Sequence, residues 1–99
     1  MLKHTLNIGL FDKDTLKQEI STAKAEQIIS KVVGDCTIKQ GNKGIYTMAN
    51  GVQVIEPSLE VIKYGGSKKQ IRQYALELKQ LLNQESIYLD TVRSNSELI

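Results

Sequence analysis

Alternation of apolar and polar residues marks a strand at each end of the chain. From Leu2 to Leu10 every second residue is apolar or is His4, and the intervening residues are polar or glycine. A period of two is typical of a strand with one buried face. A strand is therefore predicted over 2–10, and by the same pattern over 86–92. The tail 94–99 has little periodicity and is expected to fray.

Two segments between these ends carry the helical period. Thr22–Val33 has apolar residues at helical spacing, with Ser21 or Thr22 as a cap and Gly34 as a stop, which predicts the first helix. The second helix is predicted to start at "SKKQ", a capping box, after two glycines. One apolar stripe runs along it: Ile71, Tyr74, Ala75, Leu78, Leu81 and Leu82. Residues 11–20 show no such period and are expected to form a loop.

A long bent hairpin is predicted between the two helices. "CTIKQ" reads as extended, "GNKG" interrupts it, and "IYTM" resumes it. Asn50-Gly51 then favours a two-residue turn with positive φ at both positions. The returning strand "VQVIEPSLEVIKY" contains Pro57, which cannot donate a ladder hydrogen bond and is expected at a bulge or an edge, opposite "GNKG".

The predicted element order is βαββαβ, typical of an α+β ferredoxin-like sandwich. In that fold a four-stranded antiparallel sheet carries two helices on one face, with the first and third strands central and the second and fourth at the edges. The alternation alone also allows another α+β arrangement. Residues 1–99 are expected to form a single domain, since no second domain or repeat is evident.

Composition narrows the class of protein. Hydrophobic residues make up 40% of the chain and charged residues 24%, as in ordinary globular proteins. A net charge of +2 neither requires nor excludes a nucleic-acid partner. The lone Cys36 cannot form an internal disulfide, no secretory signal opens the chain, and no apolar run reaches the roughly 20 residues of a membrane span, so a cytoplasmic location is expected.

Familiar catalytic groups are scarce. His4 is the only histidine and lies on the apolar phase of the first strand, so a half-buried structural role is favoured for it. Cys36 has no second cysteine beside it, and a zinc site would need more ligands than the chain contains. The carboxylate pairs Glu56 with Glu60 and Asp12 with Asp14 do not by themselves identify acid–base chemistry. We therefore predict a protein that is not an enzyme and has no catalytic residue, metal or cofactor.

Two polar segments are candidate binding sites. The first comprises Gly65, Gly66, Ser67, Lys68, Lys69 and Arg72, where free amides, a helix start and cations would suit a small anion such as a nucleotide. The alternative is a capped helix start with solvated lysines. The second is the polar corner Gln84, Glu85 and Ser86, which alternatively only turns the last helix into the last strand. Asn83 is expected there in the left-handed conformation.

Aromatic residues could place single-stranded nucleic acid on the sheet, a known use of ferredoxin-like sheets. The segment "KGIYTM" provides Lys43, Gly44 and Tyr46 but lacks the other aromatics of an RNA-recognition motif. Tyr64, Tyr88 and Phe11 are the remaining aromatic candidates, and packing is the more common role of such residues in strands.

The segments "IEPSLEVIKYG" and "LNQESIYLDT" resemble those of a family of uncharacterised small bacterial and phage domains that end in a Gln-Glu-Ser-Val/Ile strand. The resemblance covers about residues 44–91, although "GIY" stands where such domains tend to carry Gly-Gln-Trp. It implies a ferredoxin-like fold and no established reaction.

Our leading prediction for function is a non-enzymatic accessory module, encoded by a phage or mobile element, that acts through a homo-oligomer or a protein partner. The long hairpin motivates it, because a second chain could pair with or cover an exposed strand edge. The alternatives are the small anionic ligand at Gly65–Lys69 and single-stranded nucleic acid on the sheet.

Overall fold

The computed structural model describes residues 1–41, 43–47 and 49–99. Asn42, within the predicted "GNKG" interruption, and Met48, at the end of the predicted "IYTM" strand, lie outside the described residues. The elements in chain order are β1 (Leu2–Gly9), α1 (Thr22–Val33), β2 (Thr37–Gln40), β3 (Gly44–Thr47), β4 (Gln53–Glu56), β5 (Ser58–Tyr64), α2 (Lys68–Leu81) and β6 (Tyr88–Arg93). Among these residues, no helix has the length and apolar character needed to cross a membrane.

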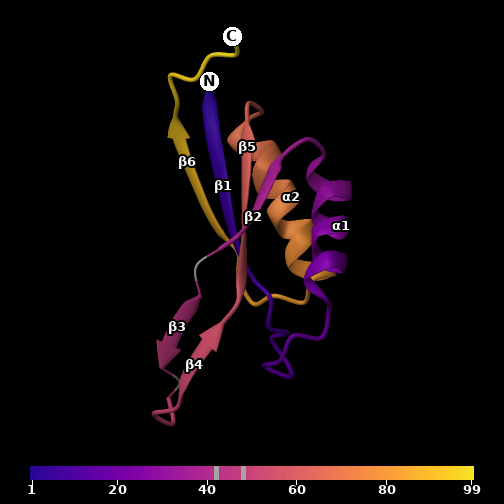
Figure 1. Ribbon diagram of the computed structural model, residues 1–99, viewed down its shortest axis with the longest axis vertical. Helices are drawn as coiled ribbons and strands as arrows, with labels where there is room; N and C mark the ends of the chain where they lie inside the picture. Colours follow the sequence, from indigo (N-terminus) through magenta and orange to yellow (C-terminus); the bar gives the residue numbers. More distant parts are fainter. Residues whose placement is uncertain (42, 48) are drawn as a thin grey trace.

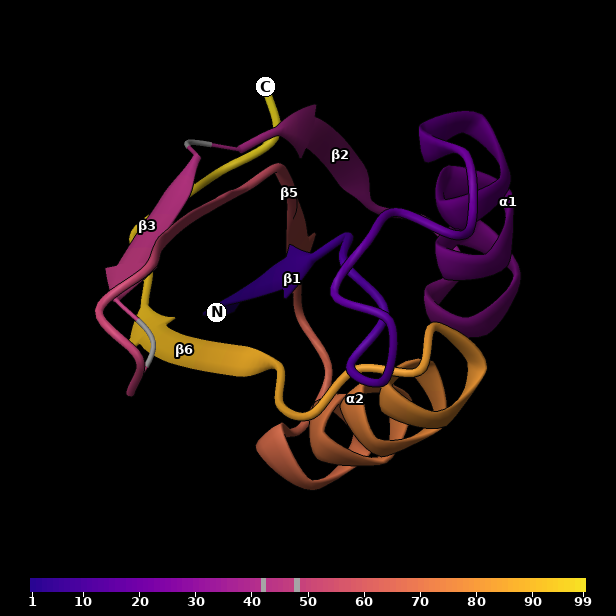
Figure 2. The same cartoon turned by 90° about the horizontal axis from the view of Figure 1, so that it is seen from below.

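The main sheet has the predicted ferredoxin-like order. Its strands lie in the order β2-β5-β1-β6, all neighbours are antiparallel, and the first and third strands of the predicted scheme, β1 and β5, are central. Both helices cover the same face of the sheet (Figures 1 and 2). The α+β class and the position of the helices are thus confirmed.

The core lies between that face and the two helices. Leu6 and Ile8 of β1 pair with Val61 and Leu59 of β5, and all four side chains are buried. The helices add Ala25, Ile29 and Val33 from α1 and Ile71 and Leu78 from α2, followed by Leu82 at its C-terminal end, whereas Leu81 of the predicted stripe is 50% exposed. Because the strand period of two and the helix period of 3.6 point to the same interior, the local patterns and the fold agree.

The predicted long return strand is wrong as a single element, because it breaks at Pro57 into β4 and β5. The Leu10 N–H donates to the Pro57 carbonyl at 3.0 Å, and the Gly41 N–H donates to the Ser58 carbonyl at 2.8 Å. Proline cannot continue the ladder through its own nitrogen, so the hairpin bends there, opposite the predicted glycine segment.

The two-residue turn predicted at Asn50-Gly51 is also wrong. The last described pair of the hairpin is Thr47 with Gln53, so Asn50 and Gly51 are not a two-residue connection between paired strand ends. Only Gly51 of the predicted pair has positive φ, at 83°, while the Asn50 side-chain oxygen accepts a hydrogen bond from the Val52 N–H at 3.0 Å. This Asx-type hydrogen bond provides the Val52 N–H with an acceptor, in a turn without the two positive φ angles of a tight hairpin.

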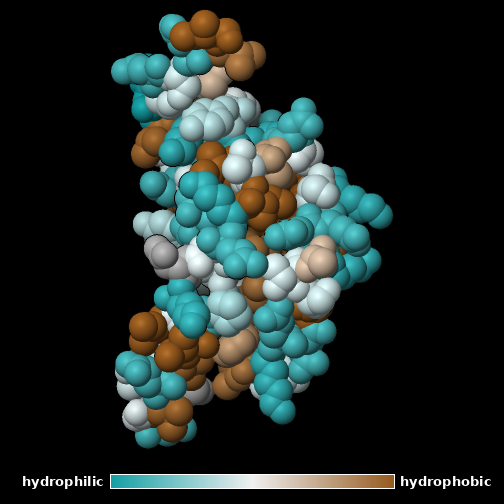
Figure 3. Space-filling model, viewed as in Figure 1, coloured by the Kyte–Doolittle hydropathy of each residue, from teal (hydrophilic) through white to brown (hydrophobic). Residues whose placement is uncertain are grey.

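The outer half of the hairpin projects from the body. Strands β3 and β4 form their own two-stranded sheet, and the molecule extends to 49 × 24 × 23 Å (Figure 1). The side chains of Ile45 and Ile55 are paired across these strands yet 62% and 51% exposed. Apolar side chains accordingly gather over the hairpin on the surface (Figure 3).

Candidate functional site

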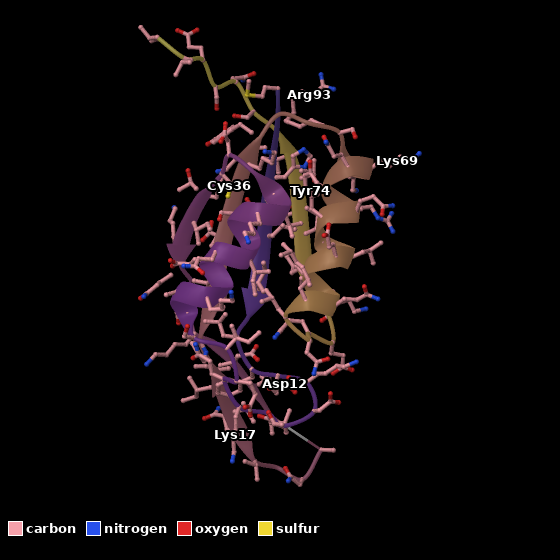
Figure 4. All side chains as sticks on the ribbon, turned by 90° about the vertical axis from the view of Figure 1, so that its right-hand side faces the viewer. Asp12, Lys17, Cys36, Lys69, Tyr74 and Arg93 are labelled. Atoms are coloured by element: carbon pink, nitrogen blue, oxygen red, sulfur yellow. The ribbon has the colours of Figure 1, made fainter. Side chains whose placement is uncertain are left out.

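A pocket of about 220 Å³, here called the corner pocket, lies where three distant segments meet at the base of the hairpin. The loop after β1 provides Phe11, Asp12, Lys13 and Leu16, the hairpin provides Tyr46 and Glu56, and the connection after α2 provides Gln84, Glu85 and Ser86. The polar corner predicted from the sequence therefore lines a pocket. Figure 4 shows Asp12 in the loop after β1, at the lower end of the body.

Glu56, the last residue of β4, is held in place by backbone on the loop side of the pocket. Its Oε2 accepts a hydrogen bond from the Phe11 N–H at 3.2 Å. The carboxylate lies directly over Gly9, where a Cβ would be 2.6 Å from Glu56 Cδ, so only glycine leaves room for it. Burial raises the pKa of Glu56, and the Phe11 hydrogen bond partly opposes that rise.

Gln84 is the buried member of the polar corner, with 6% of its surface exposed. Its side-chain amide donates to the carbonyl of Phe11 at 2.8 Å and to that of Leu82 at 3.3 Å. Gln84 therefore fixes the first loop to the end of α2. Its neighbours Glu85 and Ser86 are exposed and also line the pocket.

Asn83 fixes the position of the acidic loop. It has φ of +47°, the left-handed conformation expected at this helix end, and its side chain donates to Asp12 at 2.8 Å and to Asp14 at 2.9 Å. The Asn83 hydrogen bond, followed by those from the backbone of Asp14 and Thr15, lowers the pKa of Asp12. One amide thus bridges the two carboxylates of the predicted pair.

Replacing Asn83 separates its two contributions, the hydrogen bonds to the carboxylates and the left-handed backbone conformation. Both Asn83→Gly and Asn83→Ala should raise the pKa of Asp12, because both remove the hydrogen bond that lowers it most. The stability that ionised Asp12 contributes is lost as pH falls through its lowered pKa, so both variants should lose less stability in acid. Alanine should also cost about 1 kcal/mol relative to glycine at a left-handed position. Carboxyl NMR titration and urea unfolding measure the two effects, and an unchanged Asp12 pKa would contradict this assignment.

The predicted anion site lies at the other end of α2, where Figure 4 shows Lys69. Part of the backbone of this predicted site is already hydrogen-bonded within the protein. The Gly65 N–H donates to the Leu2 carbonyl, and the Gly66 carbonyl accepts from His4 Nε2 at 3.0 Å. Ser67 Oγ accepts from the Gln70 N–H at 3.1 Å, the predicted cap. The three cations are exposed and together line a pocket of about 350 Å³ on α2, and Lys68 and Arg72 also line a groove with Ser86.

The remaining candidates lie in structural positions. His4 is 1% exposed rather than half-buried and bonds Thr91 as well as Gly66. Burial raises the pKa of the Cys36 thiol, which disfavours the reactive thiolate. Within residues 1–41, 43–47 and 49–99 no cluster of three metal-ligating side chains occurs.

The sheet face opposite the helices was the predicted nucleic-acid surface. Tyr64 and Tyr88 are 49% and 68% exposed on it. Register places Glu60 beside Asn7 and Lys39, and Lys3 beside Tyr64, on this face, so the face carries charges of both signs rather than a basic surface. Tyr46 lies on the separate hairpin sheet instead. The three tyrosines therefore do not form one stacking platform.

Sequence reasoning missed the pocket residues that come from outside the polar corner. Phe11, Tyr46 and Glu56 are far apart in the chain, and the bend at Pro57 brings the hairpin residues to the loop. The available signal was Gly9 at the end of a strand, since a glycine there often marks the close approach of another group.

Comparisons with known proteins find a similarity of fold. The chain matches no protein-family model, and no curated protein matches it. A solved structure of a phage SAM lyase in complex with S-methyl-5'-thioadenosine is similar, with a TM-score of 0.65 and 23% identity, covering 92% of this chain and 79% of that one. A phage SAM lyase in the apo state has a TM-score of 0.63 and 20% identity, with 92% and 78% covered.

These comparisons correct one prediction. We expected a non-enzymatic protein because the chain lacks a nucleophile–base pair and a metal site. That expectation is wrong, since two solved structures that share the fold along 92% of the chain are those of an enzyme. At this level of identity the likeness shows a common fold, and this chain adopts the α+β fold of the phage SAM lyases.

Proposed function

We propose that the protein is a phage-encoded enzyme that binds S-adenosylmethionine in the corner pocket and cleaves it to a thioether nucleoside. The observation that carries the proposal is the fold shared with phage SAM lyase over 92% of the chain. One of those structures holds S-methyl-5'-thioadenosine, which is S-adenosylmethionine without its aminobutyrate group. Loss of that group requires cleavage of the bond between the sulfonium sulfur and the γ carbon.

The charge of the corner pocket suits this substrate. S-adenosylmethionine carries a sulfonium, an ammonium and one carboxylate, so its net charge is positive. The pocket presents three carboxyl groups, those of Asp12, Glu56 and Glu85, with Lys13 as its only cation among the described lining residues. The rings of Phe11 and Tyr46 provide aromatic faces that attract cations and accept a purine.

The proposed reaction needs no protein nucleophile. The electron pair of the γ-carbon–sulfur bond leaves with sulfur, which becomes a neutral thioether. As this bond breaks, either an oxygen of the substrate's own carboxylate bonds the γ carbon, giving a lactone, or a base takes a proton from the adjacent β carbon and that electron pair forms a double bond. Because the sulfonium is already a good leaving group, the protein contributes mainly by holding the substrate in a reactive conformation.

Calorimetric titration with S-adenosylmethionine, S-methyl-5'-thioadenosine and ATP tests the site. We expect the first two to bind and ATP to bind much more weakly, because its phosphates meet the pocket carboxylates. Glu56→Gln should weaken S-adenosylmethionine binding, whereas Glu60→Gln, on the sheet face outside the pocket, should not. Equal binding of ATP, or equal effects of the two variants, would refute the site.

Self-association through the hairpin is a second candidate function, supported by its exposed apolar surface. An isolated two-stranded hairpin is at best marginally stable in water, yet β3 and β4 pair only with each other among the described strands. Ile45 and Ile55 lie together on the face away from Tyr46 and Glu56. Covering that face with a second copy would stabilise the hairpin and leave the pocket side free.

Ile45→Ser with Ile55→Ser should therefore convert an oligomer into a monomer of about 11.1 kDa, the mass of one chain. Light scattering measures the molar mass, and circular dichroism checks that the body stays folded. The matched control is Leu81→Ser, because Leu81 is 50% exposed on α2, away from the hairpin. An unmutated protein that is already monomeric at high concentration would contradict the proposal.

A further inference from the structure

A second concave surface, here called the basic groove, runs between α2 and the edge of the sheet. It measures about 280 Å³ and shares only Ser86 with the corner pocket. Three cations of α2 border it, at positions 68, 72 and 79, and none of its described lining residues is acidic. Its apolar surface comes from both sides: Ala75, Leu76, Ile87 and Leu89. Leu76 is 55% exposed, so an apolar surface is left open beside a row of positive charges.

The groove is bordered by a free strand edge. In the main sheet β6 pairs with β1 and has no described strand on its other side. Alternate residues of such a strand direct their N–H and C=O groups away from the sheet, where an added strand can pair with them. A peptide that extended the sheet there would place every second side chain toward the space between strand and helix.

We propose that the basic groove binds an extended acidic peptide, which adds to β6 as a strand and places aliphatic side chains against Leu76 and Leu89. Its carboxylates would lie near Lys68, Arg72 and Lys79. Charge complementarity selects acidic over basic segments, and the free edge of β6 selects an extended conformation over a helix. A peptide is favoured over nucleic acid because four of the eight described lining residues of the groove are aliphatic and none is an aromatic residue for base stacking.

The inference is independent of the proposed function, since it concerns other residues and a ligand of opposite charge. S-adenosylmethionine is cationic and is assigned to the acidic corner pocket, whereas the peptide is anionic and is assigned to the basic groove. Failure of one proposal therefore leaves the other intact.

Fluorescence polarisation with a labelled heptapeptide of alternating Glu and Leu tests the proposal on the full chain. Saturable binding is expected, and Arg72→Glu with Lys79→Glu should weaken it about 100-fold, roughly tenfold for each reversed charge. The matched control is Lys24→Glu with Lys31→Glu, which makes the same change in net charge on α1 and should alter binding by no more than about twofold.

Two further probes separate the mechanisms. A peptide with the same side chains but N-methylated at alternate amides cannot donate to β6 and should lose most of its affinity. A single-stranded oligonucleotide of similar length should not compete with the labelled peptide. Absence of saturable binding, equal effects of the groove and control variants, undiminished binding of the N-methylated peptide, or strong competition by the oligonucleotide would each overturn the proposal.

Discussion

Glu56→Gln is expected to lower kcat/KM for cleavage of S-adenosylmethionine by about 100-fold, a loss typical of removing one positioned ionisable group. Glutamine keeps the length of the side chain and can still accept the Phe11 N–H hydrogen bond, so the loop geometry should persist. What disappears is the negative charge that faces the cationic substrate in the proposed complex. Steady-state kinetics measures the change, and Glu60→Gln, which removes a carboxylate outside the pocket, should leave kcat/KM unchanged.

The same substitution should make the protein more stable at neutral pH. Burial raises the pKa of Glu56, so the folded protein binds this proton more tightly than the unfolded chain does. Stability due to this group is therefore present in acid and is lost as pH rises from the ordinary value of 4.5 through the raised pKa. Thermal unfolding between about pH 4 and about pH 8 should show that loss in the unmutated protein and not in Glu56→Gln.

Gly9→Ala tests the position of the carboxylate rather than its charge. The added methyl group would collide with the Glu56 carboxylate, which is the free end of a flexible side chain and can swing away. We expect a loss of activity close to that of Glu56→Gln while the carboxyl group remains present. Full activity in Gly9→Ala would show that the observed position of Glu56 is not required.

His4→Ala is expected to lower the free energy of unfolding by about 3 kcal/mol, because it leaves a cavity and unpaired polar groups in the core. His4 is 1% exposed, its Nε2 donates to the Gly66 carbonyl at 3.0 Å, and its Nδ1 lies 2.9 Å from the Thr91 hydroxyl. A carbonyl only accepts, so Nε2 carries a proton. One side chain thus joins β1 to β6 and to the turn before α2.

Urea unfolding of two variants separates the contribution of the Thr91 hydrogen bond from that of the whole His4 side chain. Thr91→Val removes only the hydroxyl partner and should cost about 1 kcal/mol, the usual contribution of one hydrogen bond. His4→Ala should cost clearly more, since it also releases Gly66 and empties the ring volume. Equal, small losses in both variants would mean that the histidine is not the link between these three segments.

The elements predicted best are those whose local chemistry and burial agree. Ser67 caps α2 as expected, and β1 keeps the alternation that places Leu6 and Ile8 in the core. The hairpin was predicted less well because its shape depends on contacts between segments. Pro57 indicated a bend, but the separation of β4 from β5 depends on its hydrogen bond to Leu10, which no local pattern reveals.

The corner pocket was predicted only in part. Gln84, Glu85 and Ser86 are contiguous, so a polar cluster there was visible in the sequence. Phe11 and Glu56 join them only through the fold. The hydrogen bond from Gln84 to the Phe11 carbonyl, which closes the corner, links positions that are 73 apart in the sequence. Asn83 was predicted from its tolerance of positive φ, whereas its two carboxylate partners in the first loop could not be.

Under the proposed function, the expectation of a non-enzymatic protein fails for a chemical reason. It rested on the absence of a metal site and of a nucleophile paired with a general base. Such groups are needed when the substrate has a poor leaving group. A sulfonium substrate arrives already activated, so an enzyme acting on it can rely on positioning and electrostatics. Carboxylates such as Glu56 then carry more information about function than His4 or Cys36.

Incubation of the purified protein with S-adenosylmethionine, followed by chromatography and mass spectrometry, tests the central claim most directly. We predict that S-methyl-5'-thioadenosine accumulates in step with the loss of S-adenosylmethionine, that Glu56→Gln slows its formation, and that Glu60→Gln does not. Complete recovery of intact S-adenosylmethionine from a folded, unmutated protein would contradict the account.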